Sequence, residues 1–327
     1  MVFPGFVDLQ VNGFAGVDFS APALDAEAFA DACRSIRQSG TAAFLPTLIT
    51  SPPEVYQRNL GVIAEVMKRA EFEGCLIGIH LEGPFISPME GARGAHNPDW
   101  IEKPSADYLR RLQTWAGGNI RMMTIAAELE GAAELARCAT ETGVTISLGH
   151  QLATADDLAK LQASGARALT HLGNAVPAMM RRHDNPIWAG LANDALFATI
   201  ITDSHHLQPD LIKVIVRAKG AARLAVVSDT TAIAGLPPGR YQTLGNDVVL
   251  DECGKLYSPE TGYLVGSAAT ILDCMNHLAA LELLSPEDLI SAGVDNPLKL
   301  AGLGRQAIAD KPRVEYVPGA NRFRLLP

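Results

Sequence analysis

The sequence has few cysteines, and none lies in a spacing typical of a disulfide framework or a metal cluster. No two are separated by two residues, and their number is odd: they are Cys33, Cys75, Cys138, Cys253 and Cys274. Disulfide-stabilised secreted proteins have an even number of regularly spaced cysteines. We therefore expect free thiols and a reducing, cytoplasmic location.

The chain also lacks a basic excess, a leader-like start and a long apolar run. It has 27 Lys+Arg against 36 Asp+Glu, a net charge of -9. Nucleic-acid binding needs a basic face, so we expect no such partner, although a few His or Arg residues can hold a small anion. Met1–Gly5 does not resemble a signal peptide. No apolar run approaches the ~20 residues of a membrane span, so we expect no membrane partner.

Short apolar runs alternate with amphipathic segments along most of the 327 residues. Eight runs have the length and composition of buried strands; they are Phe6–Val11, Ala42–Leu48, Leu76–Leu81, Ile120–Ala126, Thr145–Leu148, Ala166–Thr170, Phe197–Ile201 and Leu224–Val227. The segments between them have helical periodicity, and several end at a glycine, as helices often do. Alternating strands and helices predict an α/β fold with parallel strands, and eight strands favour a closed (β/α)8 TIM-type barrel.

The pattern changes after the eighth strand. Val248–Leu250 and Lys255–Tyr257 flank a turn-like segment and predict a β-hairpin insertion at about 240–263. Helical segments then return as far as Leu303. We expect a barrel domain over residues 1–310 and an irregular C-terminal tail over 311–327, which is rich in Pro, Arg and Gly.

Four candidate functional residues come directly after strand-like runs: Glu82, His150, His171 and Asp229. Barrel enzymes build their active sites from side chains at the carboxyl ends of the strands. Neutral imidazole and carboxylate are the usual ligands of a catalytic zinc ion, which keeps an open position for water. Glu82, His150 and His171 are therefore candidate metal ligands, and Asp229 is a candidate general base acting on water beside the metal.

Each of these residues also has a purely structural interpretation. Glu82 could form a salt bridge, for example with Arg93. A histidine beside an apolar run is usually a core residue with its hydrogen bonds satisfied, and Asp229 could cap a helix or form an Asx-turn.

His96, His205 and His206 lie on expected loops at the same end of the barrel, where substrate contacts concentrate.

Taken together, the segments resemble the N-acetylglucosamine-6-phosphate deacetylases of the amidohydrolase superfamily. The resemblance runs from about Phe3 to Leu303, and its most specific parts are a His-Leu-Glu-Gly-Pro motif and a Thr-His-Leu-x-Asn-Ala motif. The matching segments, in order, are Met1–Gly13, His80–Pro84, Gly94–Pro98, Gly149-His150, Thr170–Ala175, His206, Ser228–Thr230 and Gly266-Ser267.

This resemblance implies a role for each matched residue. Glu82, His150 and His171 would bind one divalent metal ion, and Asp229 would act first as base and then as acid. His96 would help to polarise the acetyl carbonyl. The implied substrate contacts come from Gln10, His96, Asn174, Ala175 and His206. Many amidohydrolases hold a second metal at a His-x-His motif after the first strand, but this chain has Gln10-Val11-Asn12 there. Amides are poor metal ligands, so we expect a single ion.

The chain departs from the family pattern in three further places. The family usually has an Arg-Glu-Pro-Gly segment whose Arg reaches the substrate phosphate across a dimer interface. Register from Pro186 places Asp184 at that Arg, although Arg182 or His183 could take its role. The N-terminal stretch and the Gly-x-Ala-Asp tail that build a small β-sandwich are not matched. We therefore expect that second domain to be reduced to the hairpin or absent.

The sequence thus predicts metal-dependent hydrolysis of the N-acetyl amide of an amino sugar, with N-acetylglucosamine-6-phosphate as the first choice of substrate. The expected cofactor is one divalent ion, zinc by preference and iron or manganese as alternatives. The resemblance also implies a homodimer. Two alternatives remain at this point: a related amidohydrolase acting on an unphosphorylated N-acyl or cyclic amide, and a non-catalytic ligand-binding barrel.

Overall fold

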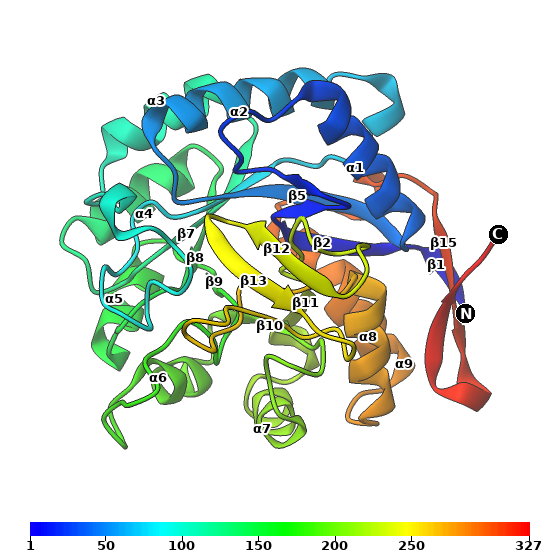
Figure 1. Cartoon of the computed structure of the whole chain (residues 1–327). Coiled ribbons are helices and arrows are strands. Elements are labelled where there is room, and N and C mark those ends of the chain that lie inside the picture. The colour runs from blue at the N-terminus through cyan, green and yellow to red at the C-terminus, as the bar shows by residue number, and fades with distance from the viewer.

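The computed structural model describes residues 1–327, and its centre is an eight-stranded parallel sheet rolled into a barrel (Figure 1). Its strands, in chain order, are β2 (Phe6–Val11), β5 (Thr41–Ile49), β6 (Ile79–Glu82), β7 (Ile120–Ile125), β8 (Thr145–Leu148), β9 (Ala168–Leu169), β10 (Phe197–Ile201) and β11 (Leu224–Val227). Neighbours in the chain are neighbours in the sheet. The two end strands meet at a parallel bridge between Val11 and Thr230, where Asn12 N donates to Thr230 O at 2.7 Å. The predicted barrel is confirmed.

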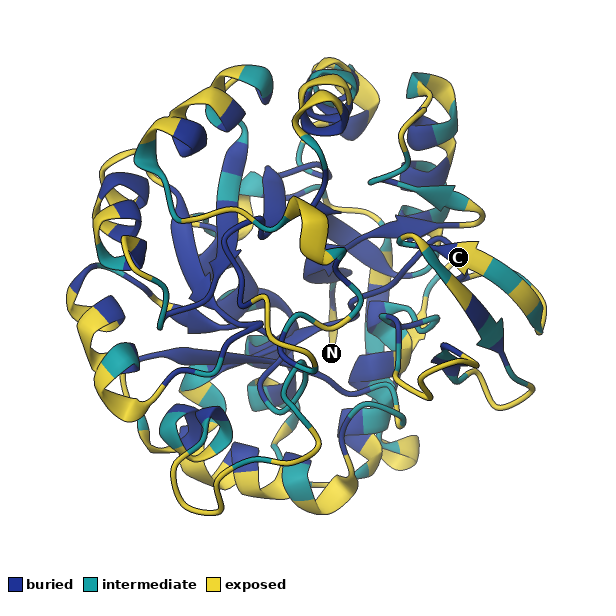
Figure 2. Ribbon diagram, turned by 60° about the vertical axis from the view of Figure 1, so that its left-hand side comes forward, coloured by how far each residue is buried: buried dark blue, intermediate teal, exposed yellow.

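Helices surround the barrel, and Figure 2 shows their buried inner faces and exposed outer faces around an almost entirely buried sheet. They are α1 (Ala26–Gln38), α2 (Pro53–Met67), α3 (Ala106–Trp115), α4 (Ala132–Glu141), α5 (Ala155–Ala163), α6 (Pro186–Ala192), α7 (Pro209–Lys219), α8 (Ile271–Ala280), α9 (Pro286–Ile290) and α10 (Asn296–Leu300). α6 was not foreseen. Its start is set by Asn185, whose side chain accepts from the backbone N–H groups of Ile187 and Trp188.

Helix α1 illustrates how the sequence sets a helix boundary and its buried face. Asp25 caps the first turn by accepting hydrogen bonds from Glu27 N and Ala28 N at 2.9 and 3.0 Å. Phe29, Cys33 and Ile36 follow at spacings of four and three residues and are all buried. That spacing places them on one stripe, which packs onto the barrel.

The strands have apolar side chains on both faces because both faces are covered. Every residue of β5 is buried, and the main core contains 83 residues that link the barrel interior to the helices. Each fully buried Leu or Phe side chain stabilises the fold by about 1.5–3 kcal/mol. This rigid frame positions the strand ends that carry the site.

A small antiparallel sheet crosses the mouth of the barrel in Figure 1. It consists of β12 (Gly239–Thr243), β13 (Asn246–Leu250) and β14 (Leu256–Tyr257). The predicted hairpin is the β13–β14 pair, and β12 adds a third strand. The sheet packs on a separate small core formed by Ala232, Ile233, Val248, Leu250, Leu256 and Val265.

The expectation of an irregular tail was wrong. β15 (Arg313–Val317) and β16 (Arg322–Leu325) form an antiparallel sheet with β1 (Val2–Pro4), in the order β1-β15-β16. Val314 and Tyr316 alternate with exposed or half-buried residues, and Phe323 packs edge-on against Phe3 and Phe6. The exposed Arg residues and the prolines obscured this alternation in the sequence. A second short hairpin, β3 (Gly13–Phe14) with β4 (Val17–Asp18), follows β2 and was also not predicted.

The five cysteines are unpaired; Cys253 is exposed and the other four are buried. No helix combines the length and apolar character that crossing a membrane requires.

Candidate active site

The four residues singled out by their position after strands lie together at the carboxyl end of the barrel. Glu82 is the last residue of β6, and His150, His171 and Asp229 each follow by two residues the end of β8, β9 and β11. His150, His171 and Asp229 have φ angles of 50°, 33° and 52°. The left-handed region is rarely occupied by residues other than glycine, and such strain concentrates at functional sites.

Three candidate ligand atoms converge on one point. Glu82 Oε1 lies 3.0 Å from His150 Nε2 and 3.0 Å from His171 Nε2, and the two Nε2 atoms are 3.0 Å apart. His150 Nδ1 donates to Ala92 O at 2.9 Å, so in neutral His150 the Nε2 atom carries a lone pair. Lone pairs of a carboxylate and an imidazole therefore face each other, which requires a cation or a proton between them.

This donor set fits a divalent metal ion. Bonds of about 2.0–2.2 Å in tetrahedral geometry separate ligand atoms by about 3.3–3.6 Å, so a small outward relaxation would accommodate the ion. All three side chains are buried, with at most 7% of each side-chain surface exposed. His171 Nδ1 has no hydrogen-bond partner within the chain. The alternative of a Glu82–Arg93 salt bridge is not realised, because the ionic contacts of Glu82 are with histidines.

The electrostatics of this cluster favour the forms that bind a metal. Burial would raise the pKa of Glu82. When a proton takes the place of the cation and the imidazoles donate to Glu82, their hydrogen bonds and charge outweigh that effect and hold the pKa well below its usual range. Burial lowers the pKa of His171. An ionised carboxylate and neutral imidazole are the required ligand states.

Asp229 is held by two amide side chains. Its Oδ1 accepts from Gln10 Nε2 at 2.9 Å and from Asn12 Nδ2 at 2.8 Å, and Gln10 Nε2 also donates to Glu82 Oε1 at 2.8 Å. Asp229 is therefore neither a helix cap nor part of an Asx-turn. Burial raises its pKa well above the usual range, and the negative charge of Glu82 raises it further. Its Oδ2 makes no hydrogen bond within the chain, so this oxygen is free to exchange a proton.

His96 is oriented as a neutral hydrogen-bond donor. Thr50 N donates to His96 Nδ1 at 3.3 Å, so Nδ1 accepts and Nε2 carries the proton. Thr50 Oγ1 lies 2.8 Å from the same Nδ1. His96 Nε2 is 3.9 Å from Glu82 Oε2, beside the metal-ligand cluster. Burial lowers the pKa of His96 to about 3, so the ring stays neutral.

His206 is fixed by Asp203. His206 Nδ1 donates to Asp203 Oδ2 at 2.7 Å, and Asp203 Oδ1 accepts from the backbone N–H groups of His205 and His206 at 2.9 Å. This leaves His206 Nε2 available to a ligand. His205 instead contacts Cys253 O and does not line the pocket.

These side chains surround a cavity of about 250 Å³. Of the predicted site residues, the cavity is lined by Glu82, His96, His150, His171, Asn174, Ala175, His206 and Asp229. Gln10 lies just beneath it through its contacts with Glu82 and Asp229. No Arg or Lys lines the cavity.

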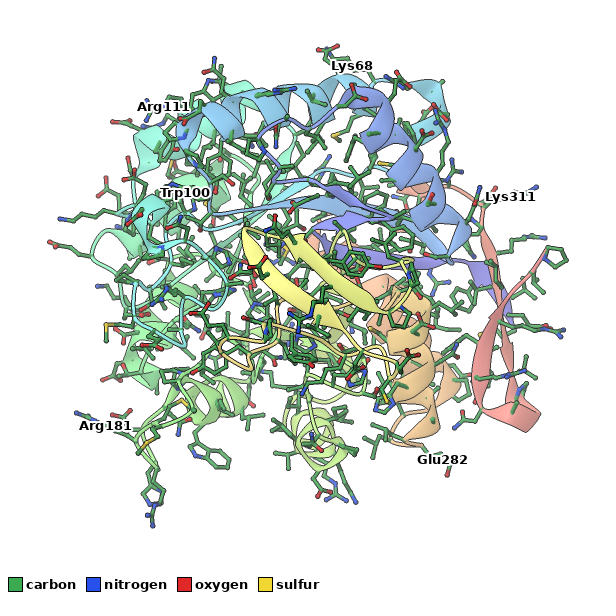
Figure 3. All side chains as sticks on the ribbon, in the orientation of Figure 1. Lys68, Trp100, Arg111, Arg181, Glu282 and Lys311 are labelled. Carbon is green, nitrogen blue, oxygen red and sulfur yellow. The ribbon has the colours of Figure 1, made fainter.

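Arg182 and His183 are not brought into this cavity within one chain. Both are exposed on the loop before α6, where the neighbouring Arg181 projects from the molecule in Figure 3. The prediction that they bind substrate therefore has no support from the geometry of a single chain.

Sequence reasoning used Asn12 only as an amide in place of a second metal's histidine and did not single out Thr50, Asp203 or Leu244, although all four lie in or support the site. Asn12 follows Gln10 by two residues, and Asp203 precedes His206 by three, so proximity to a candidate residue was an available signal for these two. Thr50 and Leu244 carry no local signal.

Comparison with known proteins places this site in context. Residues 1–307 match the model of the amidohydrolase family. N-acetylglucosamine-6-phosphate deacetylase of Danio rerio is 33% identical over 94% of this chain and 76% of its own length, and that of Homo sapiens is 35% identical over 92% and 74%. The structure of a point mutant of N-acetyl-D-glucosamine-6-phosphate deacetylase from Mycobacterium smegmatis, in complex with N-acetyl-D-glucosamine-6-phosphate, is 28% identical. It superposes with a TM-score of 0.87 and covers 99% of this chain and 85% of that one.

Proposed function

The chain belongs to the N-acetylglucosamine-6-phosphate deacetylase family of the amidohydrolase superfamily, and we propose on this basis that it hydrolyses the acetamide of N-acetylglucosamine-6-phosphate. Water adds to the amide carbonyl carbon, the C–N bond breaks, and the products are acetate and the free amine. The observation that carries this proposal is the convergence of Glu82, His150 and His171 at 3.0 Å beside the buried Asp229.

Glu82, His150 and His171 would hold one divalent ion, with zinc favoured by two imidazoles and one carboxylate and iron or manganese as alternatives. Such an ion acts as a Lewis acid toward the carbonyl and lowers the pKa of water to about 7. A single ion is supported by Gln10 and Asn12. Their amide nitrogens already occupy the space beside Asp229 as hydrogen-bond donors.

Asp229 is the proposed general base and acid. Oδ1 is anchored by Gln10 and Asn12, so Oδ2 is the oxygen that would remove a proton from the attacking water. The same oxygen would return this proton to the leaving nitrogen, which makes one carboxylate sufficient for both steps.

His96 would stabilise the developing negative charge on the carbonyl oxygen. Its Nε2 atom carries the proton and lies beside the cluster. Because its pKa is low, the ring remains a neutral hydrogen-bond donor over the working pH range. Asn174, Ala175 and His206 also line the cavity and would contact the sugar and its phosphate.

The phosphate needs a cationic partner that one chain does not place in the cavity. We propose a homodimer in which Arg182 or His183 of the partner subunit reaches the phosphate, in keeping with the family pattern. An exposed loop carrying Arg181, Arg182 and His183 supports this arrangement.

The free cysteines support a reducing, cytoplasmic location.

The absence of Arg and Lys from the cavity also favours a second candidate, hydrolysis of an unphosphorylated N-acyl amine. The deciding experiment measures kcat/KM of the metal-replete protein on N-acetylglucosamine with and without the 6-phosphate. A preference of at least about tenfold for the phosphorylated sugar is expected from one charge-assisted contact. Equal rates would favour the second candidate, and no metal-dependent turnover on either sugar would overturn the enzymatic proposal.

A further inference from the structure

Nine residues other than glycine adopt a positive φ, and five of them line the catalytic cavity: His150, His171, Ala175, Asp229 and Leu244. The first four belong to the site already described. Leu244 is the fifth, and nothing in the proposed chemistry uses it. Because backbone strain clusters where function requires it, the conformation of Leu244 calls for a functional explanation.

Leu244 occupies a turn that suits other residues much better. Leu244 and Gly245 form the two-residue loop between β12 and β13, in which Thr243 pairs with Asn246. Their φ angles are 51° and 74°. Turns with positive φ at both central residues strongly prefer Asn-Gly, and a bulky leucine at the first position is a conformational outlier.

Contacts on both sides hold this turn in place. Leu244 N donates to Asp18 Oδ2 at 2.8 Å. Asn246 Nδ2 donates to Leu244 O at 2.7 Å and to Ala95 O at 3.2 Å, which ties the hairpin to the loop that carries His96. The side chain of Leu244 is therefore presented to the site by a constrained backbone.

Leu244 lies between the catalytic cavity and a second, larger cleft. That cleft has a volume of about 1050 Å³ and runs along the start of α2, the 90–100 loop and the hairpin. Leu244, Ile49 and Leu264 line both spaces, and so does His96. Asn174, Ala175 and His206 line the catalytic cavity and do not line the larger cleft. The apolar boundary between the two spaces thus includes the neighbours of His96 in the lining and excludes the residues expected to contact the sugar.

We propose that Leu244 is a specificity-determining residue that limits the acyl group of the substrate to about the size of acetyl. With the sugar toward His206 and the carbonyl oxygen at His96, the acyl carbon chain extends toward Leu244 and Ile49. A longer chain would collide with the leucine instead of entering the cleft behind it. This inference rests on the proposed deacetylase function.

The test compares N-acetyl-, N-propionyl- and N-butyrylglucosamine-6-phosphate as substrates of metal-replete protein. Wild-type turnover of the acetyl compound is measured first, because its absence would defeat the proposed function and not the role of Leu244. Leu244→Ala and Leu244→Gly are then expected to raise the butyryl-to-acetyl ratio of kcat/KM about tenfold or more. This is the discrimination that one or two methylene groups give in an apolar pocket. Unchanged ratios in both variants would overturn the proposal.

Two further variants separate side-chain bulk from backbone strain. Leu244→Asn has a side chain of similar size that favours the turn, so it should raise Tm by about 2 °C while keeping the wild-type acyl profile. Glu282→Gly relieves a similar positive φ of 54° at a residue that lines neither the cavity nor the cleft and lies at the edge of the molecule in Figure 3, and it should raise Tm without changing any rate. If Leu244→Ala fails to fold, Leu244→Gly decides, because glycine adopts this φ freely. A broadened profile in Leu244→Asn would also contradict the proposal.

Discussion

Asn12 donates a hydrogen bond to Asp229, with 2.8 Å between Asn12 Nδ2 and Asp229 Oδ1. The donor stabilises the ionised carboxylate, whose pKa burial and the charge of Glu82 raise. Asn12 thus lowers the pKa of a general base in a site that otherwise favours the protonated form.

Removing this donor should shift the pH dependence of catalysis. Asn12→Ala loses a hydrogen bond to the charged form, so the pKa of Asp229 rises and its protonated, inactive fraction extends to higher pH. We expect the acid limb of kcat/KM to move up by about one pH unit. Rate profiles from about pH 5 to 9 measure this shift. A uniform loss of rate with an unchanged acid limb would indicate that Asn12 only shapes the cavity.

Asp229→Asn should retain the metal and lose turnover. The asparagine side chain can still accept from Gln10 and Asn12 through its oxygen, but it cannot take a proton from water. We expect kcat to fall by about 10²–10⁴-fold, the usual contribution of a positioned general base. Metal analysis and steady-state rates check both parts, with the exposed Asp107→Asn as the matched control. Turnover near the wild-type value would remove Asp229 from this role.

The metal site should depend on His171 and tolerate moderately acid pH. His171→Ala removes one of three ligands, so metal content should fall to about a tenth or less after dialysis. In the wild type, burial lowers the pKa of His171 below the ordinary value of 6.5. Protons therefore compete for this ligand only at lower pH, and the metal should remain bound at about pH 6. Metal content after dialysis across about pH 4–7 tests this. Release centred above pH 6.5 would show that the histidine is not protected by burial.

The barrel could be predicted because its strands are recognisable one at a time. Parallel strands covered on both faces appear as continuous apolar runs, and Phe6–Val11, Phe197–Ile201 and Leu224–Val227 have the predicted bounds in the structure. The β1–β15–β16 sheet could not be predicted in the same way. Its pairing joins residues about 310 positions apart, and its alternating pattern is only five residues long.

The candidate metal ligands could be predicted for a related reason. Glu82, His150 and His171 lie at a strand end or within two residues of one, so the fold class alone places them at the same end of the barrel. Thr50 orients His96 across 46 residues, and Leu244 reaches the cavity from a hairpin inserted after β11. Such relationships depend on loop conformation, which local sequence patterns do not specify.

Asp8 should make stability depend on pH. Its carboxylate is buried in β2 and accepts from Ser228 N at 3.2 Å, and burial raises its pKa to about 6 from an ordinary 3.8. Folding therefore favours the protonated carboxyl. The contribution of Asp8 to the free energy of unfolding is fully present below pH 3.8 and is lost as pH rises through 6. The loss amounts to about 3 kcal/mol.

Asp8→Asn removes this dependence while keeping a side chain of the same shape. The free energy of unfolding of the variant minus that of the wild type should increase by about 2–3 kcal/mol between about pH 4 and pH 7. Denaturant unfolding at several pH values measures it, and the exposed Asp99→Asn should follow the wild-type curve. Parallel curves for Asp8→Asn and wild type would mean that Asp8 keeps an ordinary pKa in the folded protein.

Replacing Arg182 should weaken binding of the phosphorylated substrate and leave turnover of the unphosphorylated sugar unchanged. If Arg182 of the partner subunit binds the phosphate, Arg182→Ala should raise KM for N-acetylglucosamine-6-phosphate by about tenfold or more and leave the rate on the unphosphorylated sugar unchanged. Arg181→Ala is the matched control, because Arg181 lies next in the chain, is also exposed and pairs with Asp184 at 3.3 Å. Sedimentation of wild type and both variants checks that the oligomeric state is preserved. Equal KM values for Arg182→Ala and wild type in an intact dimer would leave His183 or His206 to bind the phosphate, and a monomeric wild type would exclude any contribution from a partner subunit.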